Sequence, residues 1–200
     1  MIAGVVLAAG ASRRFGSQKL LASIGGVPLV RRSVERLIEA ALGEVVVVVG
    51  SDARAVGGTL AGLPVRIVTN PAYASGMSTS LRAGLDALTP EIEAVVVALG
   101  DQPGVGAAIV NRLVERYLAD RPPIVAPVYR GGVRGNPVLF DRSLLDELRA
   151  VTGDEGARAV IARDPARVAL VEIDTEMPRD IDRPDDLENA GPSGGRGGSE

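Results

Sequence analysis

A run of five consecutive valines at positions 45–49 constrains the fold of this chain more than any other feature of its sequence. The run lies between Glu44 and Gly50, so it is too short for a typical helix, and it has no polar residue that could face water. A strand that is apolar at every position is buried on both faces, as in the centre of a parallel sheet. The run therefore predicts a sheet covered by helices on both sides.

Strands and helices are expected to alternate along the rest of the chain. Short apolar runs predict strands at residues 2–8, 65–69, 94–99, 124–128 and 168–173, and an extended segment at 137–140. Helical spacing and composition predict helices at 29–42, 51–60, 77–88, 105–119, 144–151, 157–163 and 184–189. This order predicts an α/β fold with a mainly parallel central sheet. We expect one domain over residues 1–190, followed by a disordered Gly/Ser-rich tail over residues 191–200.

Two residue types are absent from the chain, and their absence narrows the chemistry. Without cysteine there is no disulfide, thiolate metal site or cysteine nucleophile. Without histidine there is no Ser-His-Asp triad, imidazole base or histidine-bound metal. Catalysis by this chain would use carboxylates, Lys, Arg, hydroxyls, backbone amides, or a hard metal ion held by oxygen ligands.

Charge and hydropathy indicate the kind of partner. The net charge is −3 with both signs spread along the sequence, and aromatic residues make up 2%. We therefore expect no binding to nucleic acid, because there is neither a basic block nor a base-stacking platform. The apolar runs are far below the roughly 20 residues of a membrane span, and no signal peptide is visible. We expect a cytoplasmic protein without a membrane partner.

Ligands of parallel α/β sheets bind beyond the carboxyl ends of the strands. This directs attention to the loops at 8–19, 69–80, 100–103 and 130–136. In the first loop, small residues such as Gly10 allow a ligand to approach the backbone, and Arg13 or Arg14 together with Lys19 add positive charge. This composition suits a triphosphate, although the loop matches neither a Walker A loop nor a G-x-G-x-x-G fingerprint. The alternative is a flexible surface loop with solvated cations.

Three further segments are candidates for ligand binding. Asp101 follows the strand at 94–99, where a carboxylate can hold Mg²⁺ against phosphate oxygens; alternatively, it only caps the next helix. The hydroxyls at 78–80 suit a base edge, ribose or phosphate. Considered without the other segments, they are better explained as ordinary helix caps. The acidic segment at 180–186 can supply a second metal ligand, either Asp180 or Asp182, or only solvated acids.

Taken in order, these segments resemble the MobA-like NTP transferase family, and most closely its molybdenum-cofactor cytidylyltransferase (MocA-like) branch. The resemblance rests on Leu7-Ala8-Ala9-Gly10-x-Ser12-x-Arg14-x-Gly16-x-x-Lys19, Asn70-Pro71, Gly76-Met77-Ser78, Ser80-Leu81-Arg82-Ala83-Gly84, Leu99-Gly100-Asp101-Gln102-Pro103, Gly135-x-Pro137-Val138-Leu139-Phe140, Gly153-Asp154-x-Gly156-Ala157-Arg158 and Asp180-Ile181-Asp182-x-Pro184-x-Asp186-Leu187. Each motif is modest alone, but the ordered set spans residues 2–188.

The resemblance implies a three-layer α/β/α, Rossmann-like nucleotidyltransferase fold and assigns roles to residues. Arg14, Lys19 and Asp101 would be catalytic, with Asp101 and Asp182 as Mg²⁺ ligands. The implied nucleotide-binding residues are Leu7, Ala8, Ala9, Gly10, Ala11, Ser12, Arg14, Lys19, Asn70, Ser78 and Ser80. The implied acceptor-binding residues are Gln102, Asn136, Gly153 and Asp154.

The implied reaction is Mg²⁺-dependent transfer of CMP from CTP to a phosphorylated, molybdopterin-type acceptor, with release of pyrophosphate. CTP is preferred over GTP because Ala9 stands where the guanosine-using branch has glycine, and a side chain there would narrow the space for a purine. A molybdoenzyme or chaperone would be a transient partner. The chain departs from the family pattern at Phe15, Asn136 and Arg183; the second departure bears on the identity of the acceptor.

Three alternatives stay open at this point. The first is guanylyl or other nucleotidyl transfer to a different phosphorylated metabolite. The second is a non-catalytic carrier of molybdenum cofactor or nucleotide, although a carrier need not keep Asp101. The third is a nicotinamide-linked reductase, against which the missing G-x-G-x-x-G argues.

Overall fold

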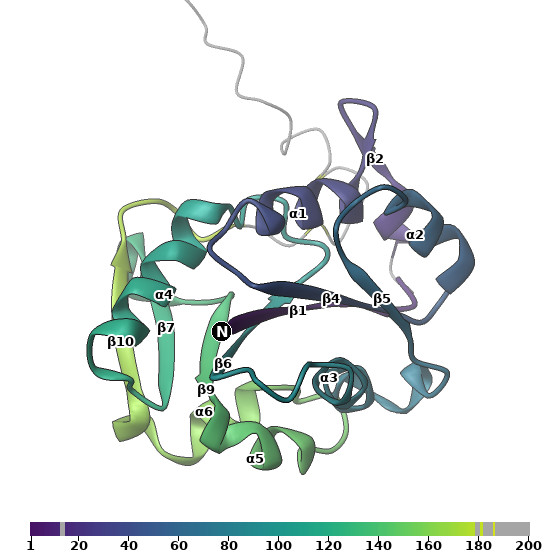
Figure 1. The fold of residues 1–200 in the computed structure, drawn as a ribbon. Helices are drawn as coiled ribbons and strands as arrows, with labels where there is room; N and C mark the ends of the chain where they lie inside the picture. The colour runs from purple at the N-terminus through teal and green to yellow at the C-terminus, as the bar shows by residue number, and fades with distance from the viewer. Residues whose placement is uncertain (13–14, 179–180, 182–185, 187–200) are drawn as a thin grey trace, which may run out of the picture.

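The centre of the computed structural model is an eight-stranded sheet with the strand order β10-β7-β9-β6-β1-β4-β5, in which β8 pairs with β7 (Figure 1). The structure describes residues 1–12, 15–178, 181 and 186. The strands are β1 (Ile2–Ala8), β4 (Glu44–Val49), β5 (Arg66–Thr69), β6 (Ala94–Leu99), β7 (Ile124–Tyr129), β8 (Val133–Arg134), β9 (Val138–Asp141) and β10 (Val168–Ile173). A separate small ribbon pairs β2 (Ser23–Ile24) with β3 (Val27–Pro28).

The expected mainly parallel sheet is confirmed. β1 is parallel to β4 and β6, β4 is parallel to β5, and β7 is parallel to β10. Only β9 and the short β8 run antiparallel to their described neighbours. Consequently, the carboxyl ends of the parallel strands lie along one edge of the sheet, which is the edge expected to bind a ligand.

The valine run forms β4 and is buried on both faces, as expected. Val47 and Val49 belong to one apolar cluster, whereas Val46 and Val48 belong to the cluster on the opposite side of the sheet. This division follows from the alternation of side chains along a strand. Each half of the run packs against a different helical layer, and this explains why every position is apolar.

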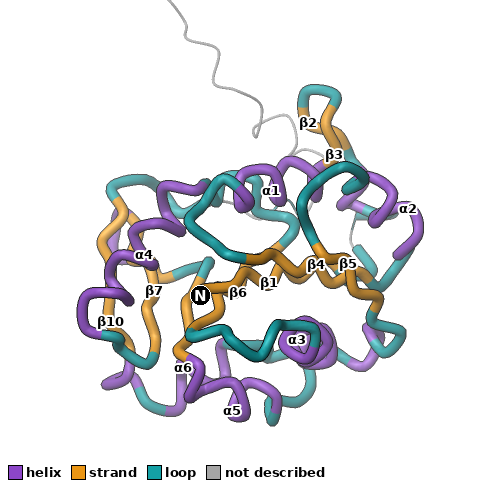
Figure 2. The backbone as a smooth tube through the Cα atoms, in the orientation of Figure 1, coloured by secondary structure: helices purple, strands orange, loops and turns teal. Residues whose placement is uncertain are grey.

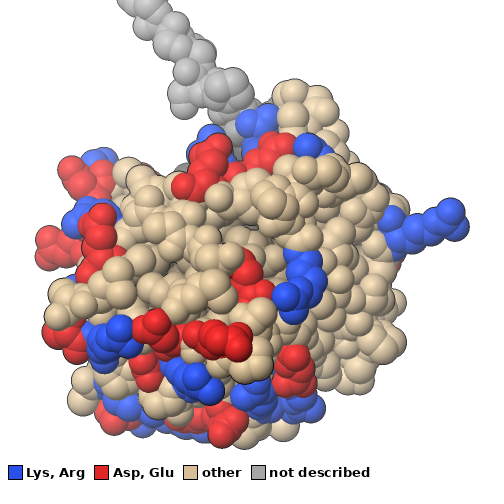
Figure 3. Space-filling model, in the orientation of Figure 1, with Lys and Arg blue, Asp and Glu red and all other residues tan. Residues whose placement is uncertain are grey.

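Helices cover both faces of the sheet, which gives the three layers that were expected (Figures 1 and 2). One layer contains α1 (Leu29–Ile38), α2 (Ala53–Thr59) and α4 (Ala107–Asp120), and the other contains α3 (Met77–Asp86), α5 (Leu145–Arg149) and α6 (Arg158–Arg163). Among the described residues, no helix is long and apolar enough to span a membrane. Figure 3 shows acidic and basic side chains interspersed over one face of the molecule.

Several boundaries differ from the sequence-based expectations. The helix expected at 29–42 ends at Ile38, after which the chain turns, and the Gly43 amide donates to the carbonyl oxygen of Ile2 beside the sheet. Leu42 still packs on the core from this turn, so apolar spacing alone suggested a longer helix. Strand β8 was not expected. The helix expected at 184–189 falls almost entirely outside the described residues, and the tail at 191–200 falls wholly outside them.

Helix α3 approaches the sheet closely because Gly84 has no side chain. A Cβ at this position would lie 2.5 Å from Cγ1 of Val5 and 3.0 Å from Cγ2 of Val48. These valines are fully buried in strands β1 and β4 and have little room to move. Gly84 therefore determines how closely α3, and with it the loop before α3, lies against the carboxyl edge of the sheet.

We predict that Gly84→Ala lowers the free energy of unfolding by about 1–3 kcal/mol, because the added methyl group overpacks the interface between α3 and the sheet. The matched control is Gly58→Ala in α2, where a Cβ would meet no heavy atom within 4 Å. This control should be neutral or more stable by about 0.5–1 kcal/mol. Urea unfolding midpoints measure both effects, and equal midpoints for the two variants would contradict the packing argument.

Candidate functional site

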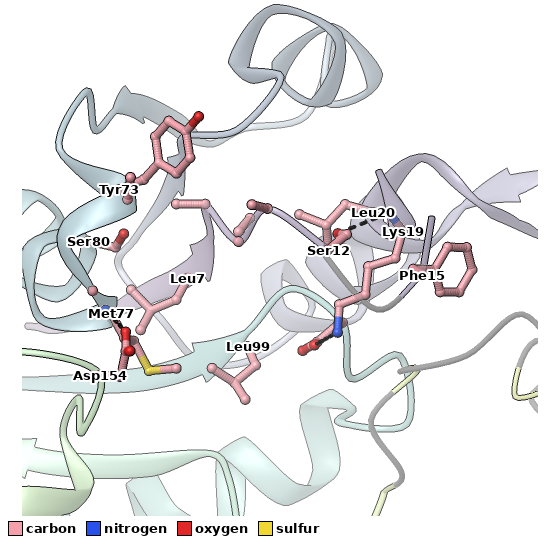
Figure 4. A pocket seen from close by; sticks show the side chains of 17 residues that line it. Leu7, Ser12, Phe15, Lys19, Leu20, Tyr73, Met77, Ser80, Leu99 and Asp154 are labelled. Atoms are coloured by element: carbon pink, nitrogen blue, oxygen red, sulfur yellow. Dashed lines mark hydrogen bonds and ion pairs between the residues drawn. The ribbon is translucent and has the colours of Figure 1, made fainter. Parts of the chain in front are cut away.

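A pocket of about 440 Å³ lies at the carboxyl edge of the sheet (Figure 4). It is lined by Leu7, Ala8, Ala9, Gly10, Ala11, Ser12, Phe15, Lys19, Leu20, Tyr73, Ala74, Gly76, Met77, Ser80, Leu99, Asp101 and Asp154. Three of the four expected loops, at 8–19, 69–80 and 100–103, contribute to this lining, whereas none of its residues comes from the loop at 130–136. The parallel sheet therefore brings together most of the motifs that the sequence singles out.

The ends of β1 and β6 adjoin at the pocket floor. The strand register pairs Leu7 with Leu99, so the loops that follow these strands begin side by side. A Cβ at Gly100 would lie 3.0 Å from the Cβ of Ala8 and 3.4 Å from the carbonyl oxygen of Leu7. Glycine at this position therefore allows the strand ends to stay close, and this proximity brings Asp101 to the first loop.

Gln18 holds the first loop in its shape. Its amide nitrogen donates to the carbonyl oxygens of Gly10 and Ser51, at 3.2 and 3.1 Å, and its amide oxygen accepts from the hydroxyl of Ser12 at 2.8 Å. The Ser12 oxygen in turn accepts from the backbone amide of Lys19 at 3.1 Å. Ser12 itself has a left-handed backbone with φ of 51°, which non-glycine residues adopt rarely. Side-chain hydrogen bonds therefore fix the shape of the loop, and the hydroxyl of Ser12 takes part in two of them.

Lys19 and Asp101 form an ion pair in the pocket. The Lys19 Nζ lies 2.6 Å from the Asp101 Oδ2, and only 15% and 18% of the two side chains are exposed. Lys19 begins a short 3₁₀ helix, which buried Leu20 anchors to the core. Lys19 is also the only lysine among the 22 basic residues of the chain. The pair joins the first loop to the end of β6 and places one cation and one carboxylate at the same side of the pocket.

Asn70 is not part of the pocket lining, but it is bonded to Ser80, which is. The side chain is buried, its amide nitrogen donates to the hydroxyls of Thr79 and Ser80 at 2.8 and 2.9 Å, and its amide oxygen accepts from the backbone amide of Ala72 at 2.9 Å. Ser80 lines the pocket from the first turns of α3. Asn70 therefore positions the start of α3, and direct contact with a nucleotide stays a prediction for it.

The start of α3 is joined to the segment 153–156. The amide of Ser78 donates to the carbonyl oxygen of Gly153 at 3.0 Å, and the amide of Met77 donates to the Asp154 Oδ1 at 3.3 Å. Gly76 makes this contact feasible, since a Cβ there would lie 2.6 Å from the backbone of Gly153. Two motifs that are about 75 residues apart in the sequence therefore form one wall of the pocket.

Several predicted residues lie outside the pocket lining. Ser78 and Gln102 are buried, and Gly153 contributes its backbone to the wall described above. Asn136 lies near Tyr129, whose hydroxyl donates to its carbonyl oxygen. Burial raises the pKa of Tyr129 to about 12. The hydroxyl is protonated at neutral pH even at the ordinary phenol pKa, so it is the donor of this bond. The acceptor roles of Gln102 and Asn136 stay predictions.

Two of the predicted charged residues, Arg14 and Asp182, lie outside the described residues. The buried Ile181, which precedes Asp182 in the sequence, donates its backbone amide to the carbonyl oxygen of Asp101 at 3.4 Å. Within the described part of the chain, no three acidic side chains form a group that could hold a metal ion. A metal at Asp101 would therefore need oxygen ligands beyond the described carboxylates.

Part of the apolar lining of the pocket was missed by the sequence analysis. Leu20 and Tyr73 belong to none of the motifs, and Met77 and Leu99 were noted only as motif positions, without a role in binding. One indirect signal was available. Gly50 follows the valine run, and a glycine at a strand end can mark the close approach of another segment, which in the structure carries Tyr73. A Cβ at Gly50 would lie 2.6 Å from the Cβ of Tyr73 and 2.8 Å from the Cβ of Ala9.

A model of the MobA-like NTP transferase domain matches residues 4–168 of the chain. The sequence is similar to the nicotine blue oxidoreductase of Paenarthrobacter nicotinovorans, with 34% identity over 184 residues that cover 88% of each protein. It is also similar to the probable molybdenum cofactor guanylyltransferase of Thermococcus sibiricus, with 30% identity over 64% of this chain and 63% of that protein.

Solved structures share the fold over almost the whole chain. A Mycobacterium sp. strain JC1 homologue of Rv0371c has a TM-score of 0.85 and 30% identity, covering 94% of this chain and 93% of that chain. The manganese complex of Rv0371c from Mycobacterium tuberculosis has a TM-score of 0.81 and 28% identity, covering 94% and 96%. A nucleotidyl transferase from Methanothermobacter has a TM-score of 0.77 and 27% identity, covering 94% and 95%.

We predict that Gln18→Ala loosens the first loop without unfolding the sheet. The substitution removes the hydrogen bonds to Gly10, Ser51 and Ser12, each worth about 1 kcal/mol, so amide hydrogen exchange at residues 15–21 should quicken at least tenfold. Ser17→Ala, at an exposed neighbouring position, is the control and should leave exchange unchanged. Identical protection in Gln18→Ala and the unsubstituted protein would show that other contacts hold the loop.

Proposed function

The chain belongs to the MobA-like NTP transferase family, which is a family of nucleotidyltransferases, and on this premise we propose that it transfers CMP from CTP to a phosphorylated, molybdopterin-type pterin. The observation that carries the proposal is the Lys19–Asp101 pair in a pocket that residues of the first loop also line. A cation, a carboxylate and exposed backbone at the carboxyl edge of a parallel sheet suit a metal-bound triphosphate.

The proposed reaction is an in-line displacement at the α-phosphorus of CTP. An oxygen of the acceptor phosphate forms the new bond to this phosphorus, the bond to the bridging oxygen of the β-phosphate breaks, and pyrophosphate leaves with that electron pair. Since the acceptor phosphate is already ionised at neutral pH, no general base is required. A reaction that needs no general base agrees with a chain that has no histidine. The protein has to orient the two reactants and neutralise charge.

Asp101 fits the role of a magnesium ligand. It is a hard oxygen donor that faces the pocket, and Mg²⁺ commonly takes only one or two carboxylates together with substrate phosphates. Bound there, the ion would supply charge neutralisation for the phosphate oxygens. The manganese complex of the mycobacterial relative supports a divalent cation. The position of Ile181 beside Asp101 agrees with a second ligand from one of its two sequence neighbours, Asp182 or the alternative Asp180.

Lys19 would change partners when the nucleotide binds. In the described structure its ammonium neutralises Asp101 at 2.6 Å. A triphosphate that enters the pocket would offer several more anionic oxygens, to which the flexible lysine side chain can turn without leaving its place on the loop. Lys19 would then stabilise the charge that builds on the α-phosphoryl group and on the leaving pyrophosphate, with Arg14 as the predicted second cation.

The preference for CTP rests on Ala9. Ala9 lines the pocket and is buried, with its Cβ facing Gly50, so its methyl group occupies space that glycine would leave open. The probable guanylyltransferase among the relatives keeps GTP as the alternative nucleotide.

Two further expectations belong to the same proposal. Residues 1–190 would form one domain, and a molybdoenzyme would be a transient partner.

An oxidoreductase is the second candidate function. It is favoured by the 34% identity to nicotine blue oxidoreductase over 88% of both chains, and the apolar wall with Leu7, Tyr73 and Leu99 would also suit a flat cofactor. Fluorescence titration with NADH and NADPH separates the two candidates. We expect no saturable binding of either cofactor, whereas saturable binding without any affinity for nucleoside triphosphates would favour the oxidoreductase.

The direct test of the proposal is pyrophosphate release from each of the four NTPs with Mg²⁺, with and without a molybdopterin-type acceptor. We expect release that requires both CTP and the pterin. Release with another NTP would keep the mechanism and contradict the base preference. Nucleotide binding without release for any NTP would favour a different acceptor or a carrier.

We predict that Lys19→Ala and Asp101→Ala each lower the rate of transfer by about 10²–10³, because each removes a group that stabilises transition-state charge. Single-turnover rates under saturating CTP measure this loss. Glu155→Ala, which removes an exposed carboxylate outside the pocket lining, serves as the control and should be near normal. Near-normal turnover in both pocket variants would contradict the mechanism.

A further inference from the structure

The pocket has two chemically different ends. Lys19 lies on one side in Figure 4, whereas Tyr73, Met77 and Asp154 lie on the opposite side. Asp101 belongs to the Lys19 end because it is paired with the ammonium of that lysine. Lys19 is the only cationic side chain among the described residues of the lining. A ligand with a triphosphate at the Lys19 end therefore extends its uncharged part toward Asp154.

Asp154 is held in place by the start of α3. Its Oδ1 accepts from the backbone amide of Met77 at 3.3 Å, and the preceding Gly153 accepts from the amide of Ser78 at 3.0 Å. On the other side of Asp154, a Cβ at Gly156 would lie 2.7 Å from the Met77 Sδ, so this glycine lets the segment lie against Met77. The carboxylate is thus fixed relative to the wall of the pocket, although the residue is exposed and accessible to a ligand.

The Asp154 end of the pocket offers a hydrogen-bond acceptor beside an apolar surface. An ionised carboxylate only accepts hydrogen bonds, and the Asp154 Oδ2 is not used by the contact to Met77. A phosphate would be repelled here, whereas an N–H group would be bound. Met77, Leu7 and Leu99 supply polarisable and apolar surface for a flat ring. The complementary ligand is a heteroaromatic ring that carries an amino group.

We propose that Asp154 is a specificity-determining residue that accepts a hydrogen bond from the exocyclic amino group of the nucleotide's base. The inference rests on the proposed nucleotidyl transfer and moves Asp154 from the acceptor, where the sequence motif assigned it, to the nucleotide. Cytosine presents a 4-amino donor where uracil presents a carbonyl oxygen, so the carboxylate favours CTP and disfavours UTP. Guanine and adenine also carry amino groups, and the space beside Ala9 would separate them from cytosine.

The test is the affinity for CTP and for UTP with Mg²⁺, measured by calorimetry without any acceptor, in the unsubstituted protein, Asp154→Asn and Glu155→Gln. The asparagine can keep the bond from Met77 through its oxygen and offers an amide donor to the 4-oxygen of uracil. We expect the unsubstituted protein to prefer CTP by about tenfold to a hundredfold, since the bond involves a charged acceptor. Asp154→Asn should lower this CTP:UTP ratio at least tenfold, and Glu155→Gln, which removes the adjacent exposed charge, should preserve it.

An unchanged CTP:UTP ratio in Asp154→Asn, with an unchanged thermal unfolding midpoint, would overturn the inference. If the same variant instead raises the KM for the pterin acceptor alone, Asp154 contacts the acceptor ring, and the assignment to the base is wrong. Failure of the unsubstituted protein to bind either CTP or UTP would contradict the proposed function itself. These results are distinguishable because binding of the nucleotide is measured separately from turnover.

Discussion

The ion pair between Lys19 and Asp101 is the interaction on which the site depends. It joins the first loop to the end of β6 across 2.6 Å, in a position where both side chains are largely covered. Partly buried charges are costly unless they are paired, so each residue stabilises the other in the ligand-free protein. The same two charges are the ones that a metal-bound triphosphate can use. The pair therefore serves the folded state and, in our account, the reaction.

The sheet makes this pair feasible through close backbone approaches. The strand ends at Leu7 and Leu99 adjoin, and Gly100 lets the chain leave β6 against Ala8 without a steric clash. On the other wall, Gly84 brings α3 down onto the valines of the sheet, and Gly76 brings α3 against the segment that carries Asp154. Small residues at these contacts place polar side chains from distant parts of the sequence around one pocket.

Short sequence patterns were enough to predict the buried central strand and the position of Asp101 at the edge of the sheet. The valine run indicated a doubly buried strand, and the position of Asp101 after an apolar strand indicated the carboxyl edge; both positions agree with the structure. Features that depend on tertiary contacts were less predictable. The helix that ends at Ile38 has apolar residues beyond its end, and Gln18 gains its importance from a bond to Ser51, 33 residues away. Leu20 and Tyr73 of the apolar pocket wall have no local signature, because such residues are equally suited to the core.

The most direct test of the account is NMR of protein labelled with ε-¹³C-lysine, because Lys19 is the only lysine and gives a single side-chain signal. We predict that this signal moves saturably when CTP and Mg²⁺ are added together, as the ammonium leaves Asp101 for the phosphates. A signal that stays fixed while calorimetry detects bound CTP would contradict the central claim that Lys19 exchanges Asp101 for the triphosphate.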